Sequence, residues 1–140
     1  MRQELDDILC EKYPRLFQER NKSIYESCMG WGFDCGDGWF SLIDKLAEDI
    51  EAATAHLPEE NRPIASQVKS KFGGLRFYIK FNIINDDATC KTLFELIKEA
   101  EAKSRKICEM CSAQHDSISC CFTLCEKCKE EKEIKEKNEP

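Results

Sequence analysis

The longest amphipathic pattern in the chain follows Asp37, a residue type that commonly caps helix N-termini. From there, apolar residues recur every three or four positions over about four turns, the spacing that places them on one face of a helix. The pattern therefore predicts a long helix that buries one stripe against a core. The stripe consists of Trp39, Leu42, Ile43, Leu46, Ile50 and Ala53.

Three further helices follow from the same period. A short amphipathic segment at the N-terminus is limited by Pro14, which disrupts a helix interior. A second long helix is expected to start at a cap provided by Asp86 or Asp87 and to end near Lys106. At the C-terminal end, charges of both signs recur at helical spacing with only Ile134 apolar, which predicts a solvated helix.

Residues 64–82 alternate between apolar and polar positions on both sides of Gly73-Gly74, which predicts a β-hairpin. Glycine tolerates positive φ at both central positions of a two-residue turn, so we place the turn at this dipeptide. That register sets Lys71 opposite Arg76. One face of the hairpin is then apolar, and the other carries Lys69, Lys71, Arg76, Tyr78 and Lys80.

The segment between the first two predicted helices, residues 28–39, has the sequence CMGWGFDCGDGW and contains four glycines and two tryptophans. Such a composition indicates a compact loop with special backbone angles rather than regular structure. Cys28 and Cys35 in this loop could start a second metal site, although they lack a second pair nearby in the sequence. Trp31 and Trp39 are candidate ligand platforms, although a core position is the commoner role of a tryptophan.

Ten cysteines in a chain without an apolar secretory leader indicate metal ligation rather than disulfides. Two C-x-x-C pairs, separated by thirteen residues, form two knuckles that can grip one Zn²⁺ ion from both sides. Four thiolates close the coordination shell, so the zinc is expected to be structural. Cys120, Cys121 or His115 could replace one of the expected ligands, which are Cys108, Cys111, Cys125 and Cys128.

Together these elements predict an α+β fold in two parts. Residues 1–104 are expected to form a core domain in which helices pack on a two-stranded or larger antiparallel sheet. Residues 105–140 are expected to form a zinc ribbon or treble-clef-like module that continues into the charged C-terminal helix.

Positive charge is segregated in this chain, whose formal net charge is −6. Residues 64–82 carry four cations and no Asp or Glu, and a directly opposed Lys71–Arg76 pair is unfavourable unless something neutralises it. Carboxylates of the same chain, such as Asp34, Asp37 or Asp44, or an anionic ligand could do so. The candidate ligand-binding residues are Lys69, Lys71, Arg76, Tyr78, Trp31, Trp39 and Asp37.

Several blocks resemble a family of small proteins encoded by bacteriophages and prophages. They are the GDGW segment at residues 36–39, the QVKSKFGGLRFY segment at residues 67–78, the AEAKS segment at residues 100–104 and the paired C-x-x-C motifs. The resemblance covers roughly residues 13–128. It implies a virus-related accessory role, such as inhibition of a host defence system, and no settled activity.

We therefore expect a small zinc-stabilised binding protein, not an enzyme, that engages a host protein or a small anionic, nucleotide-like ligand. It is expected to act in the cytoplasm, which is that of the host cell if the protein is phage-encoded, and to make no use of a membrane. A nucleic-acid-binding zinc-ribbon factor is the first alternative, disfavoured by the negative net charge. A metal-dependent nuclease built on Asp34, Asp37 and Asp44 is the second.

Overall fold

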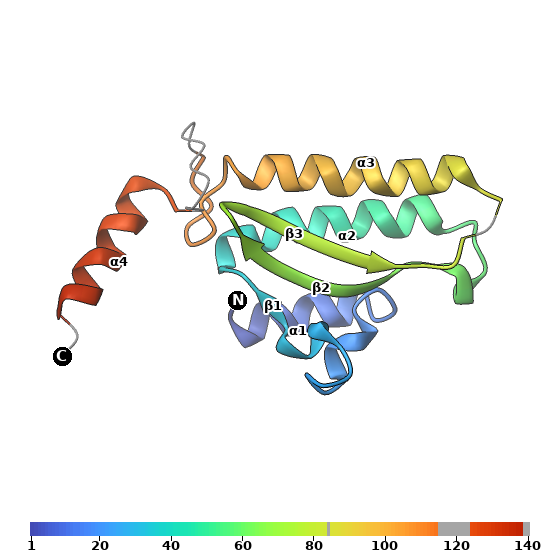
Figure 1. The fold of residues 1–140 in the computed structure, drawn as a ribbon, viewed down its shortest axis with the longest axis horizontal. Helices are drawn as coiled ribbons and strands as arrows, with labels where there is room; N and C mark the ends of the chain where they lie inside the picture. Colours follow the sequence, from blue (N-terminus) through green and yellow to red (C-terminus); the bar gives the residue numbers. More distant parts are fainter. Residues whose placement is uncertain (84, 115–123, 139–140) are drawn as a thin grey trace.

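The computed structural model describes residues 1–83, 85–114 and 124–138 of the chain, which has 140 residues. It confirms the α+β class (Figure 1). Short 3₁₀ turns lie at Gln18–Asn21 (η1), Cys28–Trp31 (η2), Asp37–Trp39 (η3) and Glu59–Asn61 (η4). The helices and strands are α1 (Gln3–Lys12), β1 (Phe33–Asp34), α2 (Phe40–Thr54), β2 (Ile64–Lys71), β3 (Gly74–Lys80), α3 (Asp87–Ser104) and α4 (Glu126–Asn138).

The sheet has three strands in the order β1-β2-β3. Strands β2 and β3 form the predicted antiparallel hairpin, whereas β1 pairs with β2 in parallel. The short strand β1 arises within the segment that the sequence indicated as an irregular loop. A sheet with this parallel edge corrects the expected antiparallel sheet.

The hairpin turn lies one residue earlier than the sequence predicted. Phe72 and Gly73 occupy the two central positions with φ of 52° and 77°, and Lys71 pairs with Gly74. Lys69, not Lys71, is therefore opposite Arg76. Contacts outside the hairpin hold this register, because Ser70 of β2 donates to Glu109 at 3.3 Å, and its partner Leu75 of β3 donates through its N–H to Ser104 Oγ at 2.8 Å.

The core lies on one face of the sheet. A row of Phe33, Val68 and Phe77 crosses the three strands and is buried, and the Phe17 ring meets Phe33 edge-on at a centroid distance of 4.9 Å. Helices α2 and α3 run side by side, with the hairpin crossing in front of α2 in Figure 1. Their fully buried side chains include Ile43, Ile50 and Leu93.

The two predicted helix caps have different outcomes. Asp86 caps α3 as predicted, because its carboxylate accepts the Thr89 N–H at 3.1 Å. Asp37 does not cap α2, whose N-cap is Trp39. Its carboxylate instead accepts the Arg2 N–H at 2.7 Å and the Arg2 guanidinium at 2.8 Å, so a distant residue has displaced the local interaction.

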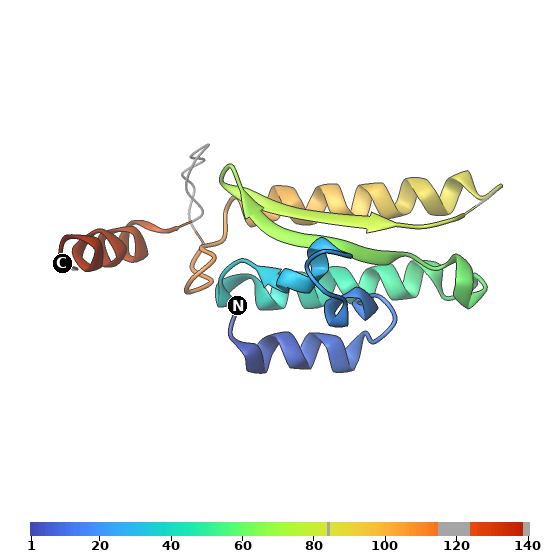
Figure 2. The same ribbon diagram turned by 60° about the horizontal axis from the view of Figure 1, so that its bottom comes forward.

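Helix α4 has the charged surface that the sequence predicted. Its one apolar side chain other than cysteine, Ile134, is exposed. The helix projects away from the body of the molecule in both views (Figures 1 and 2). In the described part of the chain, no helix has both the length and the apolar character needed to span a bilayer.

A buried ion pair fastens α1 to the loops around it. Arg20 Nε lies 3.1 and 3.0 Å from the two carboxylate oxygens of Asp6, and Arg20 also donates to the Gly30 carbonyl at 3.2 Å. Asp6 is only 5% exposed, so solvent and salt screen its ion pair with Arg20 only weakly.

We expect Asp6→Asn to destabilise the protein by about 2 kcal/mol, because it leaves the Arg20 guanidinium unpaired in a largely buried place. Thermal unfolding followed by circular dichroism measures the effect. Asp49→Asn is the matched control, because Asp49 pairs with an exposed lysine, Lys45, on α2 and should leave the melting temperature unchanged. Equal effects of the two variants would contradict the assignment.

Candidate metal centre and outer sheet face

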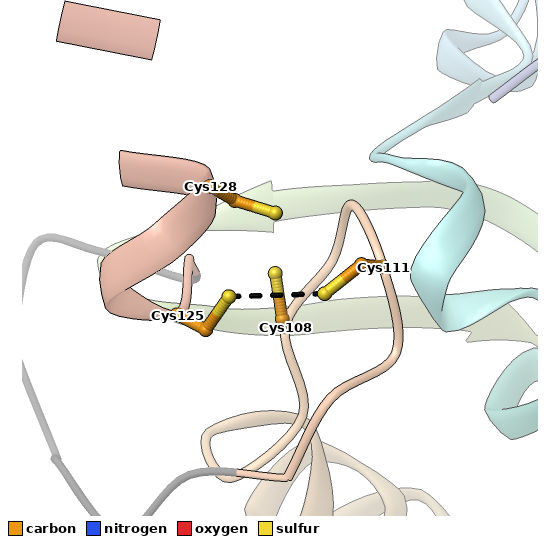
Figure 3. A group of neighbouring side chains, drawn as sticks. All are labelled: Cys108, Cys111, Cys125 and Cys128. Atoms are coloured by element: carbon orange, nitrogen blue, oxygen red, sulfur yellow. Dashed lines mark hydrogen bonds between the residues drawn. The ribbon is translucent and has the colours of Figure 1, made fainter. Parts of the chain in front are cut away.

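The first cysteine pair lies on a tight turn directly after α3. The Cys108 N–H donates to the Ala113 carbonyl at 2.8 Å, and the Ser112 N–H returns to the Cys108 carbonyl at 2.9 Å. Ser112 has φ of 66°, which reverses the chain within this turn. Both thiols therefore point to the same side of the knuckle (Figure 3).

The second pair lies where α4 begins. Cys125 directly precedes the helix, Cys128 is in its first turn, and the Lys129 N–H donates to the Cys125 carbonyl at 2.9 Å. The i, i+3 spacing on this turn brings both sulfurs to one side of the helix start. There they face the first pair (Figure 3).

The four sulfurs have the dimensions of a tetrahedral metal site. All of them lie within 4.8 Å of one another, and Cys111 Sγ is 3.7 Å from Cys125 Sγ. Zinc–sulfur bonds of about 2.3 Å in a tetrahedron separate the sulfurs by about 3.8 Å. The cluster is thus compatible with one structural zinc ion, and the predicted ligand set is brought together.

The predicted alternatives to these four ligands differ in whether the structure describes them. His115, Cys120 and Cys121 lie outside the described residues. Cys35 is buried and Cys28 is exposed, and within the described ranges the four cysteines of the two knuckles are the one metal-ligating cluster. The structure therefore does not bring Cys28 and Cys35 into a second site.

Local hydrogen bonds prepare one thiol for metal binding. Burial raises the pKa of the Cys108 thiol, but backbone N–H groups of Cys125, Cys111 and Met110 outweigh burial and lower this pKa to about 7. For Cys128, burial and the neighbouring thiols raise the pKa. A metal ion must displace the remaining protons, so its affinity is expected to fall as the pH falls.

The first knuckle is held by the GDGW segment, which is far away in the sequence. The Gly38 N–H donates to the Glu109 carbonyl at 2.6 Å, and the Gly36 N–H donates to Glu109 Oε2 at 3.0 Å. Ser70 of β2 donates to the other carboxylate oxygen at 3.3 Å. We call Gly36, Gly38, Trp39 and Ser70 the knuckle socket.

The socket accepts the knuckle only because two of its residues lack a side chain. A Cβ on Gly38 would lie less than 3.0 Å from the Cys108 carbonyl oxygen, and one on Gly36 equally close to the Glu109 carbonyl. The Trp39 indole donates to the Ile107 carbonyl at 2.8 Å and is completely buried. Trp39 is therefore a core residue, which corrects its prediction as a ligand platform.

Sequence reasoning did not identify Glu109 as the residue that joins the knuckle to the core. The glycine pattern of the GDGW segment was the available signal, because closely spaced glycines also mark a close approach of two backbones. The predicted division into residues 1–104 and 105–140 stays a prediction. The contacts of Glu109 link the two parts directly.

Only some of the predicted ligand-binding residues share the outer face of the sheet. Lys69 and Arg76 are directly opposite each other on the face of the sheet away from the core, with Tyr78 exposed beside them. Lys71 lies at the turn, with its Nζ 5.0 Å from the centroid of the Phe72 ring. Asp37 pairs with Arg2 instead, three residues beyond the end of β1.

A pocket of about 340 Å³ opens on the outer face of the sheet. Trp31, with 67% of its surface exposed, forms one side, and Lys69 forms another. Gln67, which pairs with Tyr78 across the hairpin, also contributes and was not among the predicted residues. The full lining is Cys28, Trp31, Gly32, Asp34, Gln67, Val68 and Lys69.

Three cations of the hairpin form no ion pair with a carboxylate of the described residues. No carboxylate among those residues lies within 4.0 Å of the charged groups of Lys69, Lys71 or Arg76. Lys80, the fourth cation of the hairpin, pairs with the buried Glu19 and so has a structural role.

The three aspartates proposed for a nuclease site do not converge. Asp44 accepts hydrogen bonds from Lys12 Nζ and from the Tyr13 hydroxyl, each at 2.7 Å, while Asp37 is paired with Arg2. Asp34 lines the outer pocket instead. Among the described residues, no acidic cluster suited to a divalent ion is found.

A scan against protein-family models found no match, and a search of the solved structures found none either. We infer function from the chemistry of the cysteine cluster and of the outer sheet face.

We expect Gly38→Ala to destabilise the protein by about 2 kcal/mol, because the new methyl group must push the Cys108 backbone out of the socket. Chemical denaturation measures this loss, and the knuckle should also lose hydrogen-exchange protection. Gly74→Ala is the control, since its methyl group would meet only the Arg105 side chain at 3.4 Å. A Gly38→Ala protein as stable as Gly74→Ala would disprove the socket.

Proposed function

We propose that this chain is a zinc-stabilised binding protein, not an enzyme, whose outer sheet face takes a small anionic, nucleotide-like ligand. The observation that supports this most directly is the Lys69–Arg76 pair. Two cations are directly opposite each other, beside a pocket, without a carboxylate of the described chain within 4.0 Å.

Like charges in a cross-strand pair destabilise a hairpin by a few tenths of a kcal/mol. An anion bound between them would turn this repulsion into two favourable charge-assisted contacts, and arginine suits a phosphate because its guanidinium can bind two oxygens at once. Asp34 also lines the pocket next to Lys69 in the strand register. Its carboxylate suits a ligand that carries hydroxyl groups as well as a phosphate.

Aromatic side chains flank the two cations. Trp31 and Tyr78 are 67% and 46% exposed, and both provide a flat surface on which a heterocyclic ring can stack. The Gln67 amide can both donate and accept hydrogen bonds at the edge of such a ring. A flat ring joined to a phosphate would use all of these groups, which is why we favour a nucleotide-like compound.

The biological setting of this proposal comes from the resemblance to phage and prophage proteins. It supports a phage-related accessory or anti-defence role in the cytoplasm of the host cell. A nucleic-acid-binding function is the second candidate, since zinc ribbons and basic hairpins occur in such proteins. The net charge of −6 disfavours it, because the chain as a whole repels a polyanion.

We expect one zinc ion per chain, because four thiolates select zinc among the common cellular divalent ions. Elemental analysis of protein purified without added metal, together with native mass spectrometry, measures content and identity. Cys111→Ser should lose the metal, and Cys28→Ser should retain it, since both thiols are exposed but only Cys111 is in the cluster. Another metal, or equal content in the two variants, would refute the assignment.

We expect ATP and AMP to quench the fluorescence of the exposed Trp31, while the buried Trp39 stays unchanged and serves as an internal reference. The double variant Lys69→Glu/Arg76→Glu should lose this binding with little change in melting temperature, because surface substitutions seldom affect stability strongly. The control is Lys45→Glu/Lys103→Glu, which reverses two exposed charges on α2 and α3.

A single-stranded oligonucleotide in the same titration separates the two candidate functions. Tighter binding of the oligonucleotide than of either mononucleotide, lost in the Lys69→Glu/Arg76→Glu protein, would favour the nucleic-acid function. Nucleotide binding that survives this charge reversal would exclude the outer face as the site.

A further inference from the structure

The tip of the hairpin presents a bulky aromatic residue where the backbone favours a different residue type. Phe72 occupies the first central position of the two-residue turn with φ of 52°, and Gly73 follows with φ of 77°. Turns with positive φ at both positions normally contain Asn-Gly or Asp-Gly. A phenylalanine in this left-handed region is an outlier, because its Cβ crowds the backbone.

The strain at Phe72 is not offset by burial. The side chain is 65% exposed, so most of its apolar surface stays in water. An asparagine at this position would relieve the backbone and would expose less apolar surface. A residue that is unfavourable for both the backbone and the solvent indicates a role outside the folding of the chain itself.

Two cations lie next to the tip. Lys71 is exposed, with its Nζ 5.0 Å from the centroid of the Phe72 ring, and the Arg105 side chain lies against Gly74, which follows the turn. Met110 on the first knuckle is 58% exposed and follows Glu109, which accepts a hydrogen bond from Ser70 of β2. An aromatic ring with a cationic border therefore projects at this end of the sheet.

The tip is also held rigidly from both strands. On β2, Ser70 is tied to the knuckle through Glu109, and on β3 the Leu75 N–H is tied to Ser104 Oγ. The ladder continues to the Lys71–Gly74 pair, directly below the turn. The ring is thus presented on an ordered base, which reduces the entropy lost when another molecule binds it.

We propose that the hairpin tip is an anchor for a protein partner, in which the Phe72 ring enters an apolar pocket bordered by acidic side chains. Rigid aromatic residues that fill a pocket, with charges around them, provide most of the affinity in protein interfaces. Because the cations Lys71 and Arg105 lie near the ring, charge complementarity predicts acidic side chains around the partner's pocket. The net charge of −6 disfavours the polyanionic alternatives, an anionic membrane and a nucleic acid.

This inference does not rest on the nucleotide-like ligand. Phe72 and Lys71 lie beyond the residues that line the Trp31 pocket. A protein that binds no nucleotide could still use the tip, and a variant of the tip should leave nucleotide binding unchanged. The two proposals therefore fail in different experiments.

The test compares Phe72→Asn with the wild-type protein in two measurements. Asparagine tolerates the left-handed conformation, so the melting temperature should rise. In the second measurement, peptides are selected from a random displayed library on the zinc-loaded protein, and the affinity of the purified peptides is measured by fluorescence anisotropy. Enriched peptides should combine Asp or Glu with apolar residues. Phe72→Asn should lower the affinity for these peptides by about tenfold or more.

Phe94→Asn is the control, because Phe94 is a comparably exposed aromatic residue, 61%, in the regular helix α3. It should lower the melting temperature and retain peptide binding, the opposite pattern to Phe72→Asn. A lower melting temperature for Phe72→Asn would overturn the strain argument, and peptides that bind this variant as well as wild type would overturn the anchor. Phe72-dependent binding to phosphatidylserine vesicles would instead indicate that the tip binds an anionic membrane and not a protein.

Discussion

The close contact between the first zinc knuckle and the two glycines of the GDGW segment is the constraint on which the rest of the structure depends. The Cys108–Glu109 backbone occupies the space that side chains at Gly36 and Gly38 would fill. The same turn carries a cysteine of the candidate metal centre and accepts the indole N–H of Trp39, the largest fully buried side chain. Metal binding and core packing therefore share one short segment.

The hairpin depends on this contact through its first strand. Ser70 of β2 donates to Glu109, while β3 is fixed to the end of α3 through Ser104. The knuckle follows α3 directly, so both strands are held by the segment that carries two of the four clustered cysteines. The zinc ion would then support the outer face and the hairpin tip without contacting either, and this is the kind of role expected of a closed tetrahedral site.

The sequence was sufficient for features that local chemistry decides. Helical periodicity predicted α2 and α3, Asp86 was correctly identified as a cap, and the C-x-x-C spacing predicted the four clustered cysteines. It was insufficient where a distant group competes with a local one. Arg2 takes the Asp37 carboxylate from the helix, and the pairing of β1 with β2 needs residues 35 positions away.

The hairpin turn is the clearest case in which local backbone preference did not predict the structure. Gly73-Gly74 is the better turn by backbone preference, yet the structure has the turn at Phe72-Gly73, with Ser70 and its partner Leu75 held by contacts outside the hairpin. The socket glycines, by contrast, stand where a side chain has no room. The packing of the chain accounts for the residue type at the socket glycines. It does not account for the strained Phe72 or the exposed Trp31. Because both carry large apolar rings into solvent, a bound molecule is the physical reason that would account for each of them.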